Sequence, residues 1–317
     1  MISLVLRALR KIYRLFYSKT SVNDIQLFEY KEQAASDYIK KKLNDEDSLM
    51  ISRLGATELK AIVRYYWNHY KSNKVLHYIK GDIQAFWWDK KENIEGLSIL
   101  SGFFPSTPTN LDLFSELMLE DIKEIDILGS WLPNELVISM YLKNSVKVPL
   151  KDLEPYYHLN PWSEVLKGKK VLVVHPFSKS IETQYKKRQF LFSDHRVLPD
   201  FELITIKAVQ SLIGNKPAEF SSWFEALEFM KNQISNTEFD IAIIGCGAYG
   251  LPLAAHVKRI GKKAIHLGGQ TQVLFGIIGK RWEDRDFFLD MFNEHWVRPL
   301  PEETPQNHIK VEDGCYW

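Results

Sequence analysis

Short apolar runs and amphipathic stretches alternate along most of the chain. The amphipathic stretches repeat apolar residues at helical spacing and occupy 26–45, 59–70, 111–120, the segment from Ile181, and 220–234. The apolar runs have the length of buried strands and occupy 48–52, 125–129, 146–150, 170–175, 201–207, 240–244 and 262–267. This alternation predicts an α/β fold, in which a Rossmann-like parallel sheet carries helices on both faces.

A different pattern precedes this fold and predicts an N-terminal amphipathic helix over residues 1–20. Its apolar residues at helical spacing are Ile2, Val5, Leu6, Leu9, Ile12 and Phe16, and its basic residues are Arg7, Arg10, Lys11, Arg14 and Lys19. No acidic residue precedes Asp24, and the segment is too polar to span a bilayer. We expect residues 1–19 to lie on an anionic membrane surface. The alternative is a helix that packs on the rest of the chain or on a partner subunit.

Beyond this helix we expect two regions. Residues 21–165 form an N-terminal α/β region, and residues 166–317 form a C-terminal Rossmann-like region that binds a nucleotide. Lys and Arg number 41 against 40 Asp and Glu, so no overall charge favours nucleic acid as a partner. Only two cysteines occur, which fits a protein of the reducing cytoplasm. With the N-terminal helix, the expected location is cytoplasmic, peripheral at the inner membrane face.

A glycine motif follows the strand at 240–244. Gly245, Gly247 and Gly250 fit the G-x-G-x-x-G spacing that brings a ligand phosphate to a helix N-terminus. The alternative is that these glycines only pack the helix against the strand. The next strand ends in His266 without a carboxylate for ribose hydroxyls, which disfavours NAD or FAD.

A second group of candidates follows the strand at 48–52. Arg53 at a strand end suits a diphosphate, because its guanidinium donates two parallel hydrogen bonds. Gly55 lies beside it, and the carboxylate of Glu58 suits a metal ion or a general base. The alternative is an ordinary helix start.

Further candidates lie at a strand end, in the glycine turn and downstream of the Gly268–Gly269 loop. His175 is a candidate base or phosphate donor, and the alternative is a structural histidine. Tyr249 is a candidate for stacking on a nucleobase. Arg281 is a candidate contact for the diphosphate, and the alternative is a solvated charge patch. Ser178, Ser180, Gly269 and Gln270 complete the expected nucleotide-sugar site, and the alternative role of the two serines is to cap the helix that follows. Ligands of open α/β sheets bind at the carboxyl ends of the strands. We therefore expect the loops 53–58, 130–135, 175–180, 245–250 and 268–272 to converge.

The segment Ile51–Leu59 resembles the R-F-G-D-G-E-L segment of bacterial GT-D-type glycosyltransferases. Arg53, Gly55, Glu58 and Leu59 match, whereas Ala56 stands where the first Asp of the family's D-x-E motif would be. The resemblance implies a Rossmann-like fold, a nucleotide-sugar donor, and Mn²⁺ or Mg²⁺ bound by Glu58. Segments 160–163, 166–177 and 314–317 resemble bacterial proteins associated with surface polysaccharide synthesis, such as capsule.

These patterns lead to one expected function and two alternatives. We expect a glycosyltransferase that moves a sugar from a nucleotide-sugar donor to a surface-polysaccharide or lipid-linked acceptor, with Glu58 and His175 as catalytic residues. The first alternative is a noncatalytic nucleotide- or sugar-binding partner in a polysaccharide assembly complex, which Ala56 favours. The second is an oxidoreductase that modifies a nucleotide-sugar.

Overall fold

A single parallel sheet organises the molecule. The computed structural model describes residues 2–17, 27–212 and 217–317. Met1, residues 18–20 of the expected N-terminal helix and Gln26 of the next one lie outside these ranges. Seven strands pair in the order β3–β2–β1–β7–β6–β4–β5, and each pair is parallel. The strands are β1 Leu49–Arg53, β2 Ile127–Ser130, β3 Val146–Pro149, β4 Lys170–His175, β5 Glu202–Lys207, β6 Ile241–Ile244 and β7 Lys263–His266.

The helices agree with the expected positions in most of the chain. They are α1 Ile2–Phe16, α2 Glu32–Asp45, α3 Ala56–Tyr70, α4 Lys74–Lys80, α5 Gly96–Ser101, α6 Pro108–Ile122, α7 Ser178–Tyr185, α8 Trp223–Ser235, α9 Gly250–Arg259, α10 Gln270–Leu274, α11 Lys280–Glu283 and α12 Asp286–Met291. A π-helical turn at Lys90–Glu95 leads into α5. The expected α/β fold and the N-terminal helix are confirmed.

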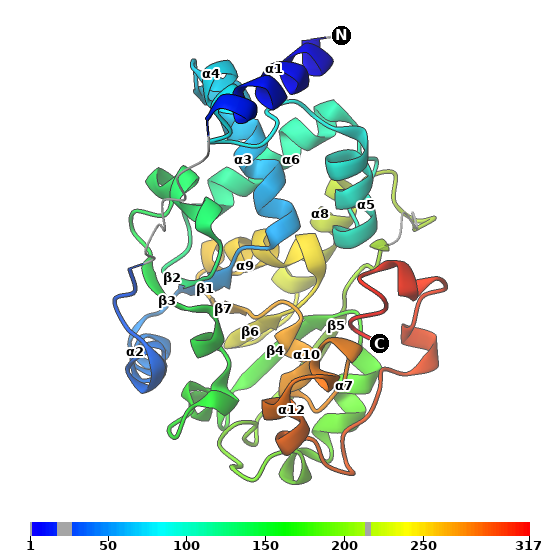
Figure 1. The fold of residues 1–317 in the computed structure, drawn as a ribbon. Helices are drawn as coiled ribbons and strands as arrows, with labels where there is room; N and C mark the ends of the chain where they lie inside the picture. The colour runs from blue at the N-terminus through cyan, green and yellow to red at the C-terminus, as the bar shows by residue number, and fades with distance from the viewer. Residues whose placement is uncertain (1, 18–26, 213–216) are drawn as a thin grey trace.

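Alternating side chains of the strands pack into two cores, one on each face of the sheet. In β4, Leu172 and Val174 join the core beneath α3, α6, α8 and α9, whereas Val171 and Val173 join the core that includes α2, α7 and α10. Figure 1 shows these two groups of helices above and below the sheet. Helices on both faces explain why the strands read as continuous apolar runs.

The sheet continues across the boundary expected at residue 165. The strands of the first region, β1 to β3, join those of the second through the pairing of β1 with β7. The two expected regions therefore share one sheet.

The strand order reverses beside β4. From β4 the chain moves outward to β5, and from β6 it moves the other way to β7. The helix after β4 covers one face and the helix after β6 covers the other. Such a reversal opens a crevice at the carboxyl ends of the two strands, where ligands of open α/β sheets bind. His175 ends β4 at this crevice, and Gly245 follows β6 there.

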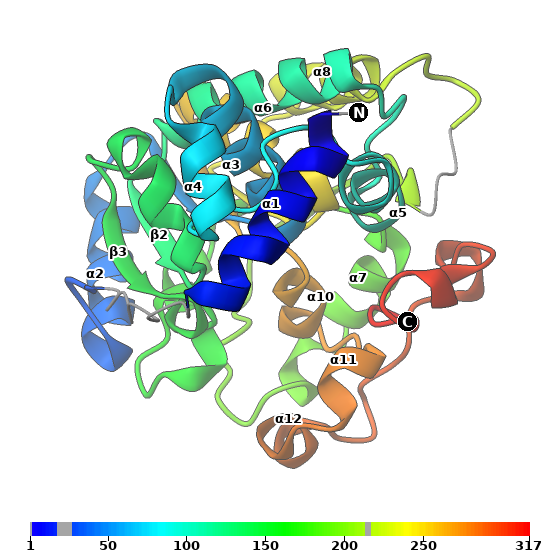
Figure 2. The same ribbon diagram turned by 45° about the horizontal axis from the view of Figure 1, so that its top comes forward.

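The N-terminal helix lies on the outside of the molecule. Figure 2 shows α1 beside α4, with which it makes its main contacts. Within the described ranges, no helix combines the length and the hydrophobicity needed to cross a membrane.

Candidate functional site

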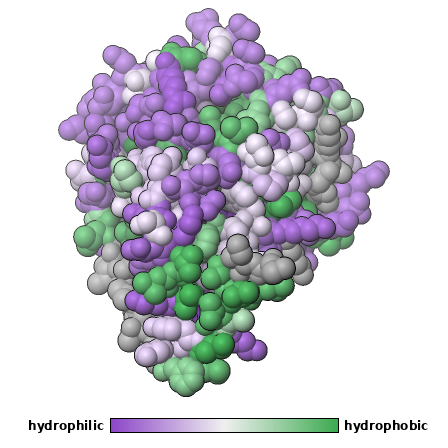
Figure 3. Space-filling model, turned by 90° about the horizontal axis from the view of Figure 1, so that it is seen from above, coloured by the Kyte–Doolittle hydropathy of each residue, from purple (hydrophilic) through white to green (hydrophobic). Residues whose placement is uncertain are grey.

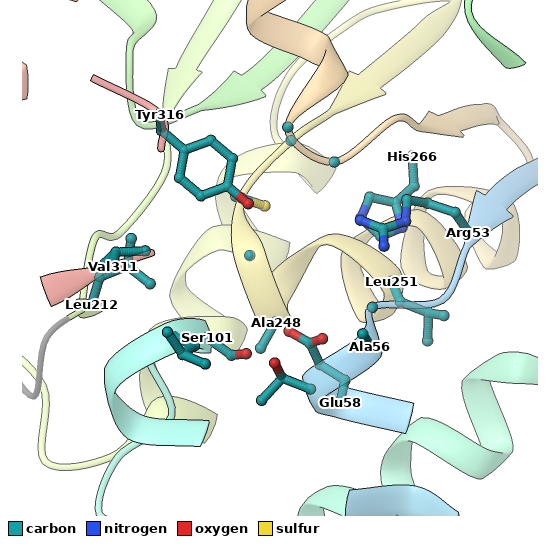
Figure 4. A pocket seen from close by; sticks show the side chains of 18 of the residues that line it. Arg53, Ala56, Glu58, Ser101, Leu212, Ala248, Leu251, His266, Val311 and Tyr316 are labelled. Atoms are coloured by element: carbon teal, nitrogen blue, oxygen red, sulfur yellow. The ribbon is translucent and has the colours of Figure 1, made fainter. Parts of the chain in front are cut away.

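A cavity lies at the carboxyl edge of the sheet. Each of the loops expected to converge there contributes to its lining, and so do α5, the chain after Lys207 and the C-terminal segment. Its polar lining residues include Arg53, Glu58, Ser101, His175, His266, Arg281, Glu312 and Tyr316. Figure 4 shows Arg53 and His266 together on one side of the cavity, Tyr316 across from them, and Glu58 and Ser101 along a third side. The cavity therefore gathers cationic and acidic groups from distant parts of the chain.

Arg53 is the cation of this cavity with the most unused hydrogen-bonding capacity. Its Nη2 donates to the carbonyl oxygen of Leu54 at 2.9 Å, and its guanidinium lies 5.2 Å from the ring centre of Trp131. Its Nε is buried without an acceptor, and no carboxylate of the described residues lies within ion-pair distance of it. Burial lowers the pKa of Arg53, and the nearby Glu58 opposes that shift. Such a cation is ready to bind an anion.

Glu58 lies in the first turn of α3, and Gly55 gives its carboxylate room. A Cβ on Gly55 would lie 1.9 Å from Oε2 of Glu58, so only glycine leaves the carboxylate in its present place. The structure gives Glu58 no hydrogen bond or ion pair with another described residue. The carboxylate is therefore available to a ligand in the cavity.

The glycine turn serves both packing and the cavity. A Cβ on Gly245 would lie 2.5 Å from the carbonyl oxygen of Gly268, and one on Gly250 would lie 2.3 Å from Nε2 of His266. These two glycines let the turn and α9 pack against the neighbouring loop. Gly247, with φ of +58°, lines the cavity together with Ala248. The first N–H groups of a helix have no acceptor within it, which makes this turn a candidate contact for an anion.

His175 is buried and neutral. Its Nδ1 accepts a hydrogen bond from the backbone N–H of Phe177 at 3.0 Å. Burial lowers the pKa of His175 to about 3. A neutral ring that accepts at Nδ1 carries its proton at Nε2, so His175 can donate a hydrogen bond in the cavity but is a poor base. This geometry disfavours the role of base expected for it.

His266 is a cavity residue that sequence reasoning noted only as a strand end. Its Nδ1 lies 3.0 Å from Oγ of Ser52, and burial, together with Arg53, lowers its pKa to about 3. The rule that selected Arg53, a polar residue at the carboxyl end of a buried strand, also applies to His266 and would have found it.

The C-terminal segment forms a further wall, which sequence reasoning missed as part of the site. Tyr316 lines the cavity, and its ring lies against Gly269, where a Cβ would come within 2.7 Å of it. Arg281 stacks on Tyr316 at 4.7 Å and pairs with Glu312. Arg281 therefore borders the cavity as expected, but its guanidinium is already partly neutralised. No pattern in the sequence predicts that this segment folds back to the sheet.

Other expected site residues lie outside the cavity lining. Tyr249 is buried and stacks on Trp223 at 5.0 Å, so its ring does not line the cavity. Gln270 accepts a hydrogen bond from Tyr156 at 2.9 Å. Gly250 contacts His266 rather than the cavity space.

Ser178 and Ser180 are also outside, because an internal carboxylate occupies the start of α7. Glu303 accepts hydrogen bonds from the N–H of Lys179 at 2.8 Å, and from the N–H and the hydroxyl of Ser180. The place expected for a ligand phosphate is thus filled by the protein itself. The serines do not cap the helix either, because its N-cap residue is Phe177 and the carboxylate of Glu303 accepts from its first N–H groups.

The donor groups for a metal ion are few. Glu58 and Glu312 are the carboxylates that line the cavity, and Ala56 stands beside Glu58. Within the described part of the chain, no three or more His, Cys, Asp or Glu side chains gather as metal ligands. The Mn²⁺ or Mg²⁺ expected at Glu58 stays a prediction.

Comparison with known proteins identifies no relative of this chain. No family model matches the chain, and no curated protein or solved structure is significantly similar to it.

Proposed function

We propose that the chain is a glycosyltransferase that moves a sugar from a nucleotide-sugar donor to a surface-polysaccharide or lipid-linked acceptor. The observation that carries the proposal is that Arg53, Glu58 and the glycine turn at 245–248 line one cavity at the carboxyl edge of the sheet. These groups come from β1, α3 and the β6–α9 connection. An anion-binding side chain, a free carboxylate and a helix N-terminus together provide the groups that sugar transfer from a diphosphate needs.

The donor's diphosphate would bind between Arg53 and the glycine turn. Arg53 offers N–H donors that no carboxylate of the described residues occupies, and the turn offers backbone N–H groups. His175 adds a donor at Nε2, because its Nδ1 already accepts from Phe177. Negative charge grows on the diphosphate as its bond to the sugar breaks. Fixed donors in a partly enclosed site stabilise that charge without rearranging.

Glu58 would take the proton of the acceptor hydroxyl. In the transfer step the acceptor oxygen bonds to the anomeric carbon, the bond from that carbon to the diphosphate oxygen breaks, and the hydroxyl proton passes to the carboxylate. Glu58 suits this role better than His175, whose Nδ1 is engaged and whose pKa burial lowers to about 3.

A second candidate is a noncatalytic nucleotide- or sugar-binding partner of a polysaccharide assembly complex. Ala56 favours it, because the resembling family carries an Asp at that place for its metal. Such a protein would keep the anion-binding half of the cavity, Arg53 and the glycine turn, without turnover. An oxidoreductase has less support, because β7 ends in His266 and offers no carboxylate to a ribose.

A thermal-shift screen of the purified chain tests the proposal. The panel contains UDP, GDP, CMP, their common sugar conjugates, NAD and NADP, each with and without Mn²⁺. A ligand at ~100 times its Kd raises the free energy of unfolding by about 2.7 kcal/mol, which is measurable. We expect stabilisation by one nucleoside diphosphate and its sugar conjugate. Stabilisation by NAD or NADP alone, or by no member of the panel, would contradict the proposal.

A further inference from the structure

The helix α1 is attached to the molecule through its basic face. Arg7 pairs with Asp89 at 2.6 Å. Arg10 donates to the carbonyl oxygen of Ile83 at 3.1 Å and lies 4.6 Å from the ring centre of Tyr78. Both arginines project from the same side of the helix, since they are three residues apart. These three contacts hold the side of α1 that carries Arg7 and Arg10 against the rest of the molecule. Without them, an anionic surface would attract this side.

A buried side chain of α1, that of Leu6, lies at the edge of this basic face. Leu6 packs with Tyr78 and Ile83 in a small apolar cluster of its own, separate from the two cores of the sheet. Its burial and the arginine contacts fix how α1 is rotated about its axis. The opposite side of the helix must then face outward.

That outward side is apolar. The stripe consists of Val5, Leu9, Ile12 and Phe16, whose exposed fractions run from 42% for Leu9 to 77% for Phe16. Leu4 and Leu15 flank it, with exposed fractions of 70% and 76%. Figure 3 shows hydrophobic side chains gathered in a patch on this face of the molecule, among hydrophilic surroundings. Single exposed apolar residues are ordinary, but a continuous stripe on one helix marks a surface that meets another apolar phase.

We propose that this stripe docks α1 in the plane of an anionic lipid bilayer, with its apolar side chains in the boundary between headgroups and acyl chains. A helix that lies in the interface needs a continuous apolar face and cationic residues beside it. Lys11 is exposed on α1, which contains no acidic residue. The exposed Tyr17 follows the helix, and tyrosine favours the headgroup level.

The charges on the neighbouring segments support a negatively charged partner. Lys71 lies shortly before α4, Lys80 is the last residue of α4, and both are exposed. The nearby acids Asp82 and Asp89 are engaged by His77 and Arg7. An anionic headgroup would therefore meet exposed lysines. A second copy of the chain would instead bring its own lysines against those of the first, and like charges repel.

Vesicle co-sedimentation of the full chain, without any nucleotide, tests this inference. One set of vesicles contains phosphatidylcholine alone, and the other contains phosphatidylcholine and phosphatidylglycerol in equal parts. We expect binding to the anionic vesicles that weakens with added salt. The double variant Leu9→Gln/Ile12→Gln should bind at least about tenfold more weakly, because two apolar side chains no longer enter the bilayer. The matched control, Leu113→Gln, replaces an exposed leucine of α6 and should bind as the wild type does.

The circular dichroism and melting temperature of the double variant should equal those of the wild type, since neither side chain is buried. Three results would overturn the inference: no binding of the wild type to anionic vesicles, unchanged binding of the double variant, or a dimer of the wild type that the double variant loses. The last result would identify a second copy as the partner of the stripe. Because no nucleotide is present, none of these results depends on the proposed function.

Discussion

His175 accepts a hydrogen bond at Nδ1 from the backbone N–H of Phe177, 3.0 Å away. Because burial lowers the pKa of the ring to about 3, His175 is neutral near pH 7 and carries its proton at Nε2. This pairing turns a strand-end histidine into a fixed hydrogen-bond donor. It also moves the role of base in the proposed reaction to Glu58.

The substitution His175→Gln should remove part of the acid sensitivity of the fold. An unfolded histidine has a pKa of about 6.5, so below that pH protons bind the unfolded chain first. The stability that the neutral ring contributes is present above pH 6.5 and is lost as the pH falls toward 3. Between pH 7 and pH 5 the wild type should lose about 2 kcal/mol more than the variant, measured by denaturant unfolding. The control His195→Gln, at an exposed position, should keep the wild-type slope.

The dependence of stability on pH should have the opposite sign for a buried carboxyl group outside the cavity lining, that of Glu154. Burial raises the pKa of Glu154 to about 8, and Oη of Tyr156 lies 2.7 Å from its Oε2. The stability that its protonated form contributes is present below an unfolded pKa of about 4.5 and is lost as the pH rises through 8. Between pH 5 and pH 8 the wild type should lose roughly 3 kcal/mol more than Glu154→Gln, which keeps a partner for Tyr156. Parallel stability curves for the two proteins would show that the carboxyl group is not held protonated.

Much of the fold and part of the site follow from local pattern. The strand at 170–175 has its expected limits because its central residues, Val171 to Val174, are apolar and buried between the helices on both faces. Arg53 and Glu58 lie in the cavity as expected, because the carboxyl ends of parallel strands share one edge of the sheet.

The rest of the candidate site depends on contacts between segments that are distant in the sequence. Tyr249 stands within the glycine turn, yet the ring of Trp223 holds it in the core. Ser180 lies in the first turn of a helix, as expected, but Glu303, 123 residues further along, takes the place of a ligand there. Tyr316 reaches the cavity only because the C-terminal segment folds back against Gly269. Spacing along the chain carries no information about such contacts.

The substitution Gly55→Ala should impair function more than stability. A methyl group there would displace the carboxylate of Glu58, which is the end of a flexible side chain and can move at small cost. We expect a change in the free energy of unfolding below about 1 kcal/mol, because alanine replaces glycine at a helix N-cap. Sugar transfer should fall by at least about 100-fold, as it should in Glu58→Gln. The first variant displaces the carboxylate base, and the second replaces it with an amide that cannot accept the proton.

Nucleotide affinity distinguishes this effect from loss of the whole site. Both variants should bind the donor within about threefold of the wild type, since Glu58 donates no hydrogen bond to the diphosphate. If Gly55→Ala were as active as the wild type, the position of the Glu58 carboxylate would not matter for transfer.

The affinity of the wild type and of Arg53→Gln for the stabilising nucleoside diphosphate, measured by calorimetric titration, tests the central claim most directly. Arg188→Gln is the matched control, because that arginine stacks on Tyr185 and pairs with Asp200 outside the cavity lining. We predict that Arg53→Gln binds about 10- to 100-fold more weakly, through loss of charge-assisted hydrogen bonds, and that the control binds as the wild type does. An affinity of Arg53→Gln within about twofold of the wild type would contradict the account, because the diphosphate would then bind elsewhere.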